Sequence, residues 1–540
     1  MVMNSFETYM SCACLVLSVA STSCSDHSKP AGSKSFVPAD LRPITKTDER
    51  FQSYNVEMVE VTGGRFWKPY KDIAELLKAQ DAPKRSSQNG SDVPAGMDPG
   101  LYQQRPPIDL SNARIRKLAA ALGPAYLRVS GTWANTTYFD DSDRPAPKIA
   151  RRGFSEVLTR QEWKSVIDFA QAVNAKLVTS FATSLGTRDA AGVWTPAQAT
   201  RLLAYTKSVG GSIAAAEYMN EPTYAAMGGA PAGYDAAAYG RDIRVFVPFM
   251  KKNSPETIIL GPGGVGEGIA LAPIGLAGTQ LKSEDLLKAT GPVFDAFSHH
   301  SYNATSQRCA SMGPASQTTA QAALSDEVLS RADKIEEFYA GLRDKYEPGK
   351  ALWLTETADA ACGGNPWAST FLDTFRYLDQ LGRLAKSGLR VHMHNTLASS
   401  DYGLLDDATL TPRPNYWAAL MWRKFMGTTV LDAGAPPVPT LHLYAHCMRD
   451  QPGGVALLAI NTDRGVAQTF ELAIPADRYT LTSTKLEDGV IQLNGSTLEL
   501  GAGDTLPELN AAQSSSGQLT LGAASITFLI FSNANNSSCR

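Results

Sequence analysis

The sequence predicts an α/β chain in which a (β/α)8 barrel of the TIM type is followed by an all-β sandwich domain. Between residues 51 and 427, eight short apolar runs alternate with segments whose apolar residues recur at helical spacing, which is the repeat of a parallel barrel. Beyond this region, short alternating runs are separated by turn residues with no helix between them, as in a sandwich. A chain of 540 residues is long enough to form both domains.

The expected elements follow in chain order. The first barrel strand is predicted at residues 54–61, ending at Gly63, and Ser111 is expected to cap a helix that ends at Leu122. The other predicted barrel strands are 125–129, 176–181, 213–219, 257–261, 293–300, 351–355 and 389–394. The other predicted helices are 159–173, 196–209, 236–253, 324–345 and 370–387. The predicted sandwich strands are 441–445, 455–461, 469–474, 479–485, 490–493, 497–500, 518–521 and 526–531.

The first 28 residues resemble a signal peptide, because an apolar core at residues 12–20 is followed by small residues, although no Lys or Arg precedes it. We therefore expect export to the periplasm or the exterior, with Cys24 as a candidate for lipid anchoring. The predicted organisation is a signal-like segment (1–28), a linker or edge segment that joins the sandwich (29–50), the barrel (51–427) and the sandwich (428–540).

The charge and hydrophobicity of the chain argue against nucleic acid and membranes as partners. The chain has 50 Lys and Arg against 53 Asp and Glu, so its net charge of -3 gives no field that would favour nucleic acid. No run after the first segment approaches the ~20 apolar residues of a membrane span. We expect a monomer that needs no cofactor.

Four cysteines lie outside the first segment: Cys309, Cys362, Cys447 and Cys539. An even number suits an oxidising compartment, although free thiols are an alternative. Cys309 follows the sixth predicted strand and Cys362 the seventh, so a disulfide could join two neighbouring loops at the barrel mouth.

Two glutamates end predicted barrel strands. Glu221 closes an apolar run and is followed by Pro222, which cannot continue the strand, and Glu356 closes a similar run. The active sites of such barrels lie at the carboxyl ends of the strands. Glycoside hydrolysis needs two carboxyl groups, one as acid and one as nucleophile or base, and a separation of roughly 5 Å implies retention of configuration. A structural ion pair is the alternative for either glutamate alone.

Four histidines near strand ends suggest a metal site as another interpretation: His299, His300, His392 and His394. No Asp or Lys ligand stands at a matching strand end. We therefore expect these side chains to form hydrogen bonds around a sugar, and we predict no metal.

Several motifs together resemble one family. They are SYNVEMVEVTGGRFWKPY (53–70), PAYLRVSGT (124–132), YMNEP (218–222), SHHSY (298–302), WLTETADAACGG (353–364) and DYGLLD (401–406). This combination resembles glycoside hydrolase family 79, a family of clan-A retaining barrels that includes heparanases and β-glucuronidases.

The resemblance implies a role for each matching residue. Glu221 would be the acid/base, Glu356 the nucleophile, and Asn220 would bind the sugar 2-hydroxyl. Further contacts with sugar hydroxyls are expected from Glu57, Thr132, His300 and Tyr302. The uronic carboxylate would be received by the backbone N–H groups of Gly363 and Gly364 and by Tyr402.

The sequence departs from that of mammalian heparanase in two ways. Only residues 135–155 stand where that enzyme has a long excised linker, so a single unprocessed chain is expected. Basic clusters are also sparse, Arg151-Arg152 being the clearest. We therefore predict a retaining β-glucuronidase acting on a glucuronide or a uronic-acid-containing oligosaccharide. The alternatives are an endo-acting heparanase-like enzyme, a non-catalytic carbohydrate-binding protein and a metal hydrolase.

Overall fold

The structure is a computed structural model that describes residues 35–72, 93–94, 97–144, 150–269, 280–312 and 317–540. The signal-like segment, with Cys24, lies outside the described residues. Residues Ser35–Arg540 form one compact unit.

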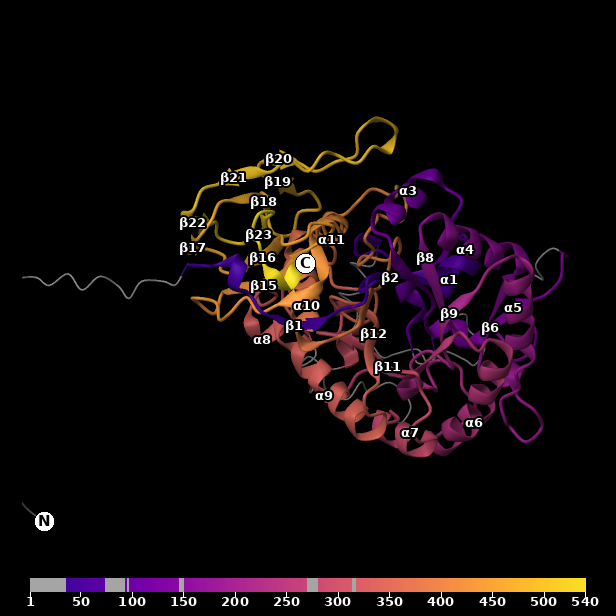
Figure 1. Cartoon of the computed structure of the whole chain (residues 1–540). Coiled ribbons are helices and arrows are strands. Elements are labelled where there is room, and N and C mark those ends of the chain that lie inside the picture. Colours follow the sequence, from indigo (N-terminus) through magenta and orange to yellow (C-terminus); the bar gives the residue numbers. More distant parts are fainter. Residues whose placement is uncertain (1–34, 73–92, 95–96, 145–149, 270–279, 313–316) are drawn as a thin grey trace, which may run out of the picture. The chain divides into compact units, whose positions relative to one another are not determined.

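A closed barrel of eight parallel strands forms the first part of this unit (Figure 1). Neighbours around the barrel follow the order β2, β5, β8, β9, β10, β11, β12, β13 and back to β2. The predicted barrel is therefore confirmed. The strands are β2 (Gln52–Glu57), β5 (Ala125–Ser130), β8 (Ala175–Ser180), β9 (Ile213–Glu217), β10 (Ile258–Gly264), β11 (Ala296–Tyr302), β12 (Ala351–Ala358) and β13 (Val391–His394).

Helices surround the barrel, because their apolar faces pack on the outward-facing side chains of the strands. They are α1 (Met58–Thr62), α3 (Ala113–Ala121), α4 (Arg160–Ala172), α5 (Ala197–Ser208), α6 (Ala236–Asn253), α7 (Ser283–Thr290), α8 (Asp326–Leu329), α9 (Arg331–Tyr346), α10 (Phe371–Ser387) and α11 (Pro414–Phe425). No helix among the described residues is both long and apolar enough to cross a membrane.

Three local predictions were wrong. The first strand ends at Glu57 rather than at Val61, because Glu57 and Glu60 form a capping box that starts α1. Asn112, not Ser111, caps α3, and its side chain accepts from the N–H groups of Arg114 and Ile115. The single helix predicted at 324–345 is divided into α8 and α9.

The C-terminal part contains a nine-stranded sheet and a two-stranded sheet. The large sheet contains β1 (Pro43–Lys46), β14 (Met426–Leu431), β15 (Leu441–Met448), β16 (Val455–Asn461), β18 (Ala476–Thr482), β19 (Gln492–Leu493), β20 (Ser496–Thr497), β21 (Ala512–Ser514) and β23 (Ser525–Phe531). The small sheet pairs β17 (Gln468–Leu472) with β22 (Gly517–Leu521).

The large sheet is covered on both faces. Leu457 and Leu529 face Phe470 and Leu519 of the small sheet in one apolar core. Leu458 and Phe528 belong to the barrel's core, which includes side chains of α10 and α11. This is why β16 and β23 are buried along their whole length. The edge strand β1 precedes the barrel in sequence but pairs with β14, which follows it.

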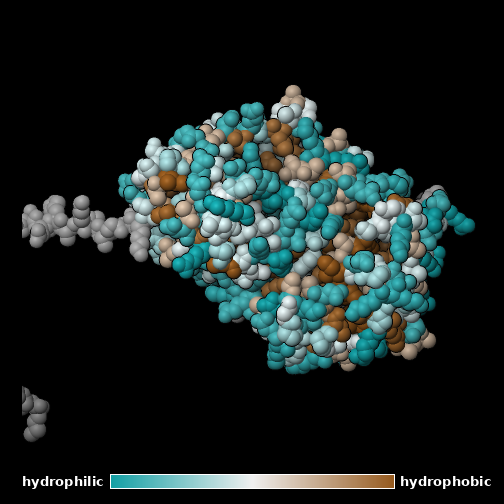
Figure 2. Space-filling view, in the orientation of Figure 1, coloured by the Kyte–Doolittle hydropathy of each residue, from teal (hydrophilic) through white to brown (hydrophobic). Residues whose placement is uncertain are grey.

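Two short strand pairs complete the fold: β3 (Gly64–Trp67) runs antiparallel to β4 (Tyr102–Arg105), and β6 (Thr137–Asp140) runs parallel to β7 (Glu156–Thr159). Figure 2 shows hydrophilic residues over much of the visible face, with hydrophobic residues gathered in smaller areas. Most large apolar side chains of the described residues are therefore in the interior.

Candidate active site

Glu221 lies just beyond β9 in a sharp turn. Its backbone is left-handed, with φ 46° and ψ 63°, and it caps a short 3-10 helix that begins at Pro222. A glutamate rarely adopts this conformation, so neighbouring contacts must hold it. Asn135 provides them, because its side-chain amide bonds both the N–H and the C=O of Asn220, at 2.8 and 2.9 Å.

Glu356 lies on β12 at a β-bulge. His299 pairs with Leu354 and His300 with Glu356, so Thr355 is the extra residue. Asn55 donates to the carbonyl of Thr355 at 3.1 Å, and the Thr355 hydroxyl donates to Glu217 at 2.9 Å. The bulge thus turns both Thr355 and Glu356 toward the barrel interior.

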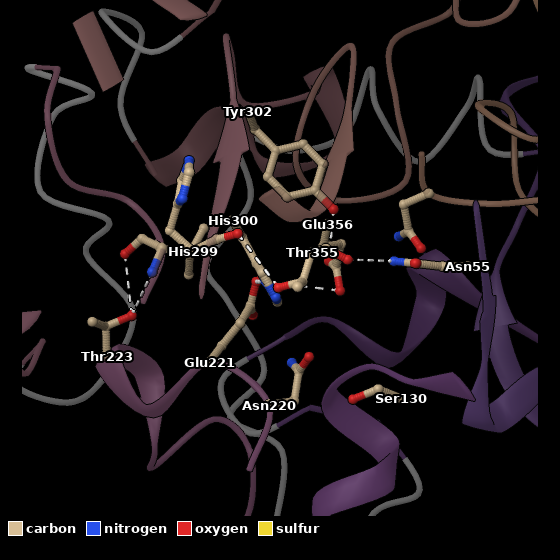
Figure 3. Close-up of polar contacts among 12 residues, drawn as sticks. Asn55, Ser130, Asn220, Glu221, Thr223, His299, His300, Tyr302, Thr355 and Glu356 are labelled. Atoms are coloured by element: carbon tan, nitrogen blue, oxygen red, sulfur yellow. Dashed lines mark hydrogen bonds and ion pairs between the residues drawn. The ribbon is translucent and has the colours of Figure 1, made fainter. Parts of the chain in front are cut away.

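The two glutamates point toward one another across the barrel mouth, with His300 beside them (Figure 3). One oxygen of each carboxyl group and a ring nitrogen of His300 all lie within 4.8 Å of one another. The side chains of Glu221 and Glu356 are only 12% and 8% exposed. The two carboxyl groups therefore share one nearly dry site.

Arg128, on β5, connects these groups from below. Its guanidinium donates to Glu356 Oε2 at 2.9 Å, to Glu217 Oε2 at 2.8 Å and to Asn220 Oδ1 at 2.7 Å. Burial lowers the pKa of Arg128, but the carboxylates of Glu217 and Glu356 outweigh this and raise the pKa above its ordinary value. A permanent positive charge thus lies beside Glu356.

The same guanidinium fixes the tautomer of His300. Arg128 Nη2 lies 3.3 Å from His300 Nε2, and because arginine can only donate, Nε2 must accept. The ring proton is then on Nδ1, which donates to Glu221 Oε1 at 2.9 Å. Glu221 Oε2 remains as the oxygen that can carry a proton toward a ligand.

The pKa of Glu221 is raised. Burial is the largest cause, the His300 hydrogen bond opposes it, and the nearby Glu356 charge adds to it. Glu356 is surrounded by donors instead, since Tyr302 donates to Oε1 at 2.7 Å and Arg128 to Oε2 at 2.9 Å. Burial thus raises the pKa of one carboxyl group, whereas the other accepts hydrogen bonds from a guanidinium and a phenol.

Asn220 presents its amide nitrogen to the site, because its Oδ1 is taken by Arg128. Tyr302 remains a neutral phenol, since burial and then the Glu356 charge raise its pKa well above the ordinary value. Both predicted binding residues therefore lie in the site, each as a hydrogen-bond donor.

Glu57 and Tyr402 are joined through Asn395, whose amide donates to Glu57 Oε1 at 3.0 Å and to the Tyr402 hydroxyl at 3.1 Å. Burial and then the Glu356 charge raise the pKa of Glu57 well above its ordinary value. A Cβ on Gly131 would fall 1.4 Å from Glu57 Oε2, so only glycine fits there. Thr132 follows Gly131 and is half-buried at the start of a 3-10 helix, Thr132–Thr136.

Gly363 and Gly364 lie in the loop after β12, next to the disulfide that joins Cys309 and Cys362. A Cβ on Gly364 would come 3.2 Å from the ring of Tyr402, so the loop abuts that tyrosine. A second disulfide joins Cys447 and Cys539 in the C-terminal part.

The expected roles of three histidines around the sugar were wrong. Neighbouring side chains on a strand alternate between its two faces, so His299 faces outward, where it stacks on Tyr339 of α9 at 4.6 Å. His392 and His394 also face outward, against Tyr377 of α10. Only His300 of the four faces the two glutamates.

A cation could be held by Glu221, His300 and Glu356, whose ligand atoms are close enough. However, Arg128 donates to Glu356 and contacts Nε2 of His300, while Nδ1 of that ring carries a proton. A divalent ion would have to displace that proton and share a dry site with a guanidinium. The donor set fits acid–base chemistry better than metal coordination.

The sequence prediction missed Arg128, Glu217, Asn135 and Asn395. Arg128 and Glu217 each stand inside an apolar strand run, and a charge in such a run is the signal that could have found them. Asn135 lies in the short 3-10 helix Thr132–Thr136 and Asn395 directly follows β13, and an asparagine in either place gives no such signal.

A barrel with two close glutamates at the ends of its strands is the architecture of barrel glycosidases. The family model described as "Glycosyl hydrolase family 79, N-terminal domain" matches residues 106–382. The chain belongs to glycosyl hydrolase family 79.

Two relatives and one solved structure illustrate the similarity. Heparanase-like protein 1 of Arabidopsis thaliana is 30% identical over 376 residues, covering 66% of this chain and 65% of that protein. Mouse (Mus musculus) heparanase is 27% identical over 490 residues, covering 80% and 88%. A 4-O-α-L-rhamnosyl-β-D-glucuronidase from Fusarium oxysporum has the same fold, with a TM-score of 0.59, 15% identity, and coverage of 92% of this chain and 98% of that chain.

Proposed function

We propose that the protein is a retaining glycosidase that cleaves β-linked glucuronic acid residues by double displacement. The observation that carries this proposal is the 4.8 Å limit on the distance between oxygens of Glu221 and Glu356. Retaining glycosidases have their two carboxyl groups roughly 5–5.5 Å apart, whereas inverting enzymes leave room for a water molecule.

In the first step, Glu221 protonates the glycosidic oxygen through Oε2 while Glu356 attacks the anomeric carbon. The leaving group departs with the proton, and a covalent glycosyl–enzyme ester forms on Glu356. Arg128 and Tyr302 hold the attacking carboxylate in place. In the second step, Glu221 takes a proton from water, whose oxygen displaces Glu356 and restores the original configuration.

The uronic carboxylate is received by backbone N–H groups of Gly363 and Gly364 and by the hydroxyl of Tyr402. Because Asn395 donates to the Tyr402 oxygen, that hydroxyl is left to donate its own proton. Burial and the charges of Glu57 and Glu356 raise the pKa of Tyr402 well above its ordinary value, so the phenol stays protonated. Neutral donors of this kind bind an anion without a buried cation.

The test uses p-nitrophenyl β-D-glucuronide and the isosteric variants Glu356→Gln and Glu221→Gln. Loss of the nucleophile should reduce hydrolysis to the limit of detection. Loss of the acid should lower kcat by about 10²–10⁴-fold on a poor leaving group, with a much smaller effect on nitrophenolate. Glu256→Gln, an exposed glutamate at the amino end of β10, is the control and should retain full activity.

Wild-type protein that binds but does not cleave the glycoside would favour a carbohydrate-binding role, and loss of activity with a chelator would favour a metal hydrolase. Product analysis on a defined glucuronide oligosaccharide separates release of terminal glucuronic acid from internal cleavage, which a heparanase-like endo enzyme would give.

Export is part of the same proposal. Two disulfides among the described residues support an oxidising compartment. Secretion with cleavage of the first segment would be detected by N-terminal sequencing of protein recovered outside the cytoplasm.

A further inference from the structure

We infer that Arg308 is a positioning residue for the recognition of uronic acids: it orients the Gly363–Gly364 segment so that two backbone N–H groups can receive the substrate's carboxylate. This inference rests on the proposed function and names a residue that determines its specificity.

Arg308 follows β11 in a 3-10 helix, Gln307–Met312, and its side chain is fully buried. Its guanidinium lies over the ring of Tyr70, at 3.9 Å from the centroid. Nη2 donates to the carbonyl of Lys68 at 2.6 Å and to Asp401. Two segments from different parts of the chain, one with Lys68 and Tyr70 and one with Asp401, therefore converge on this one side chain.

The glycine loop is a third segment that contacts Arg308. Arg308 Nη1 donates to the carbonyl of Gly363 at 2.8 Å and to that of Gly364 at 2.9 Å. Ser400 adds a second donor to the Gly363 carbonyl, at 2.9 Å. Ser306 donates to the carbonyl of Cys362, also at 2.9 Å. Three successive carbonyl groups are thus held toward the Arg308 side.

The orientation of these carbonyls determines that of the N–H groups. In a trans peptide, the C=O and the following N–H point in opposite directions. The N–H groups of Gly363 and Gly364 therefore point away from Arg308. Neither donates to an acceptor within the described part of the chain, whereas the next N–H, of Asn365, donates to Asp359 at 2.9 Å. Buried N–H groups need a partner, so this pair requires a ligand or water.

The backbone of the loop requires such support. Cys362, Gly363 and Gly364 have φ values of 66°, 78° and 85°, all in the left-handed region. That region is unfavourable for a residue with a Cβ such as Cys362, and it persists where surrounding contacts hold it. The Arg308 bonds and the Cys309–Cys362 disulfide hold the loop from the same side.

Arg308 acts through the loop and does not reach the substrate. Its Nη atoms are occupied by the carbonyls and by Asp401, and the Asp401 carboxylate balances its charge. A substrate carboxylate therefore meets peptide N–H groups and not the guanidinium.

The test compares p-nitrophenyl β-D-glucuronide with its methyl ester, which has the same ring without the negative charge. In Arg308→Gln, kcat/KM for the glucuronide should fall by about 10–100-fold, mainly through KM, while kcat/KM for the ester stays within about twofold of the parent value. Arg308→Lys, which keeps one donor, should retain part of the preference for the glucuronide over the ester. Ser400→Ala should lower that preference a few-fold.

The matched control is Arg343→Gln, because Arg343 also donates to a loop carbonyl, that of Lys350, which precedes β12 and so lies at the opposite end of that strand from the glycine loop. Equal losses on both substrates, or unchanged discrimination in Arg308→Gln, would overturn the inference. If that variant does not fold, Arg308→Lys decides in the same way. Failure of the parent protein to cleave either substrate would instead count against the proposed function.

Discussion

Glu221 and Glu356 are the same residue type in two different environments. Glu221 is buried, with a single His300 donor on Oε1, whereas Glu356 accepts from Arg128 and Tyr302. Because the two side chains are chemically identical, any difference in their roles must come from these surroundings.

This difference predicts a pH effect at His300. The hydrogen bond from His300 lowers the pKa of Glu221, against burial, which raises it. Removing that donor in His300→Leu should leave the proton more tightly bound, so the alkaline limb of kcat/KM should move to higher pH. The profile should be measured with a poor leaving group, because that step needs the acid. An unchanged limb would show that another group controls it.

Sequence reasoning placed both glutamates at the ends of barrel strands, because an apolar run that stops at a carboxylate is visible in the sequence. It could not find the partners that give each glutamate its environment. Arg128 contacts Glu217, Asn220 and Glu356 from another strand, and only the closed barrel brings these side chains together.

At the scale of elements, the strands and helices with a regular apolar pattern could be predicted from the sequence, whereas the places where a strand stops early or bulges could not. The eight barrel strands follow from their apolar runs, whereas α1 follows from a capping box within what reads as a continuing strand. The bulge at Thr355 has no sequence signature, because any residue can be the extra one. It nevertheless decides which way Glu356 points.

The packing of β11 against α9 predicts a pH-dependent stability. Glu336 of α9 lies 3.4 Å from His299, and burial raises the pKa of Glu336 to about 8 and lowers that of His299 to about 3. A carboxyl group whose pKa is raised on folding stabilises the protein below the ordinary glutamate pKa, and this contribution is lost as pH rises toward about 8. Each pKa unit corresponds to about 1.4 kcal/mol.

Glu336→Gln removes this titration. As pH rises from 5 to 9, we expect the melting temperature of the parent protein to fall relative to that of the variant. Thermal unfolding of both proteins at fixed ionic strength measures this difference. A constant difference across that range would contradict the prediction. Glu337→Gln, at an exposed position of α9, is the control and should show no such divergence.

At the scale of the whole molecule, one buried carboxylate joins the barrel to the C-terminal sheet. Asp379 of α10 accepts from His442 Nδ1 at 2.5 Å and from the Tyr444 hydroxyl at 2.6 Å, both on β15. Its other oxygen accepts from Arg383, which also contacts Asp333 of α9. The sheet and two barrel helices thus share one network.

Because the two parts share this network and one apolar core, we expect them to unfold together. Tyr444→Phe removes one hydrogen bond to a charged group and should cost about 1.5–3 kcal/mol of unfolding free energy. Calorimetry should show a lower melting temperature with a single transition. Two separate transitions in the parent protein would show that the parts are independent.

The pairing of β1 with β14 has a consequence for biosynthesis. The N–H of Thr47 donates to the carbonyl of Thr428, which the ribosome adds 381 residues later. β1 therefore has no partner strand until the whole barrel has been translated. In a truncated chain that ends before β14, the backbone N–H and C=O groups of β1 would have no partner strand and could pair with other chains. We therefore expect soluble expression to require a chain that includes both β1 and β14.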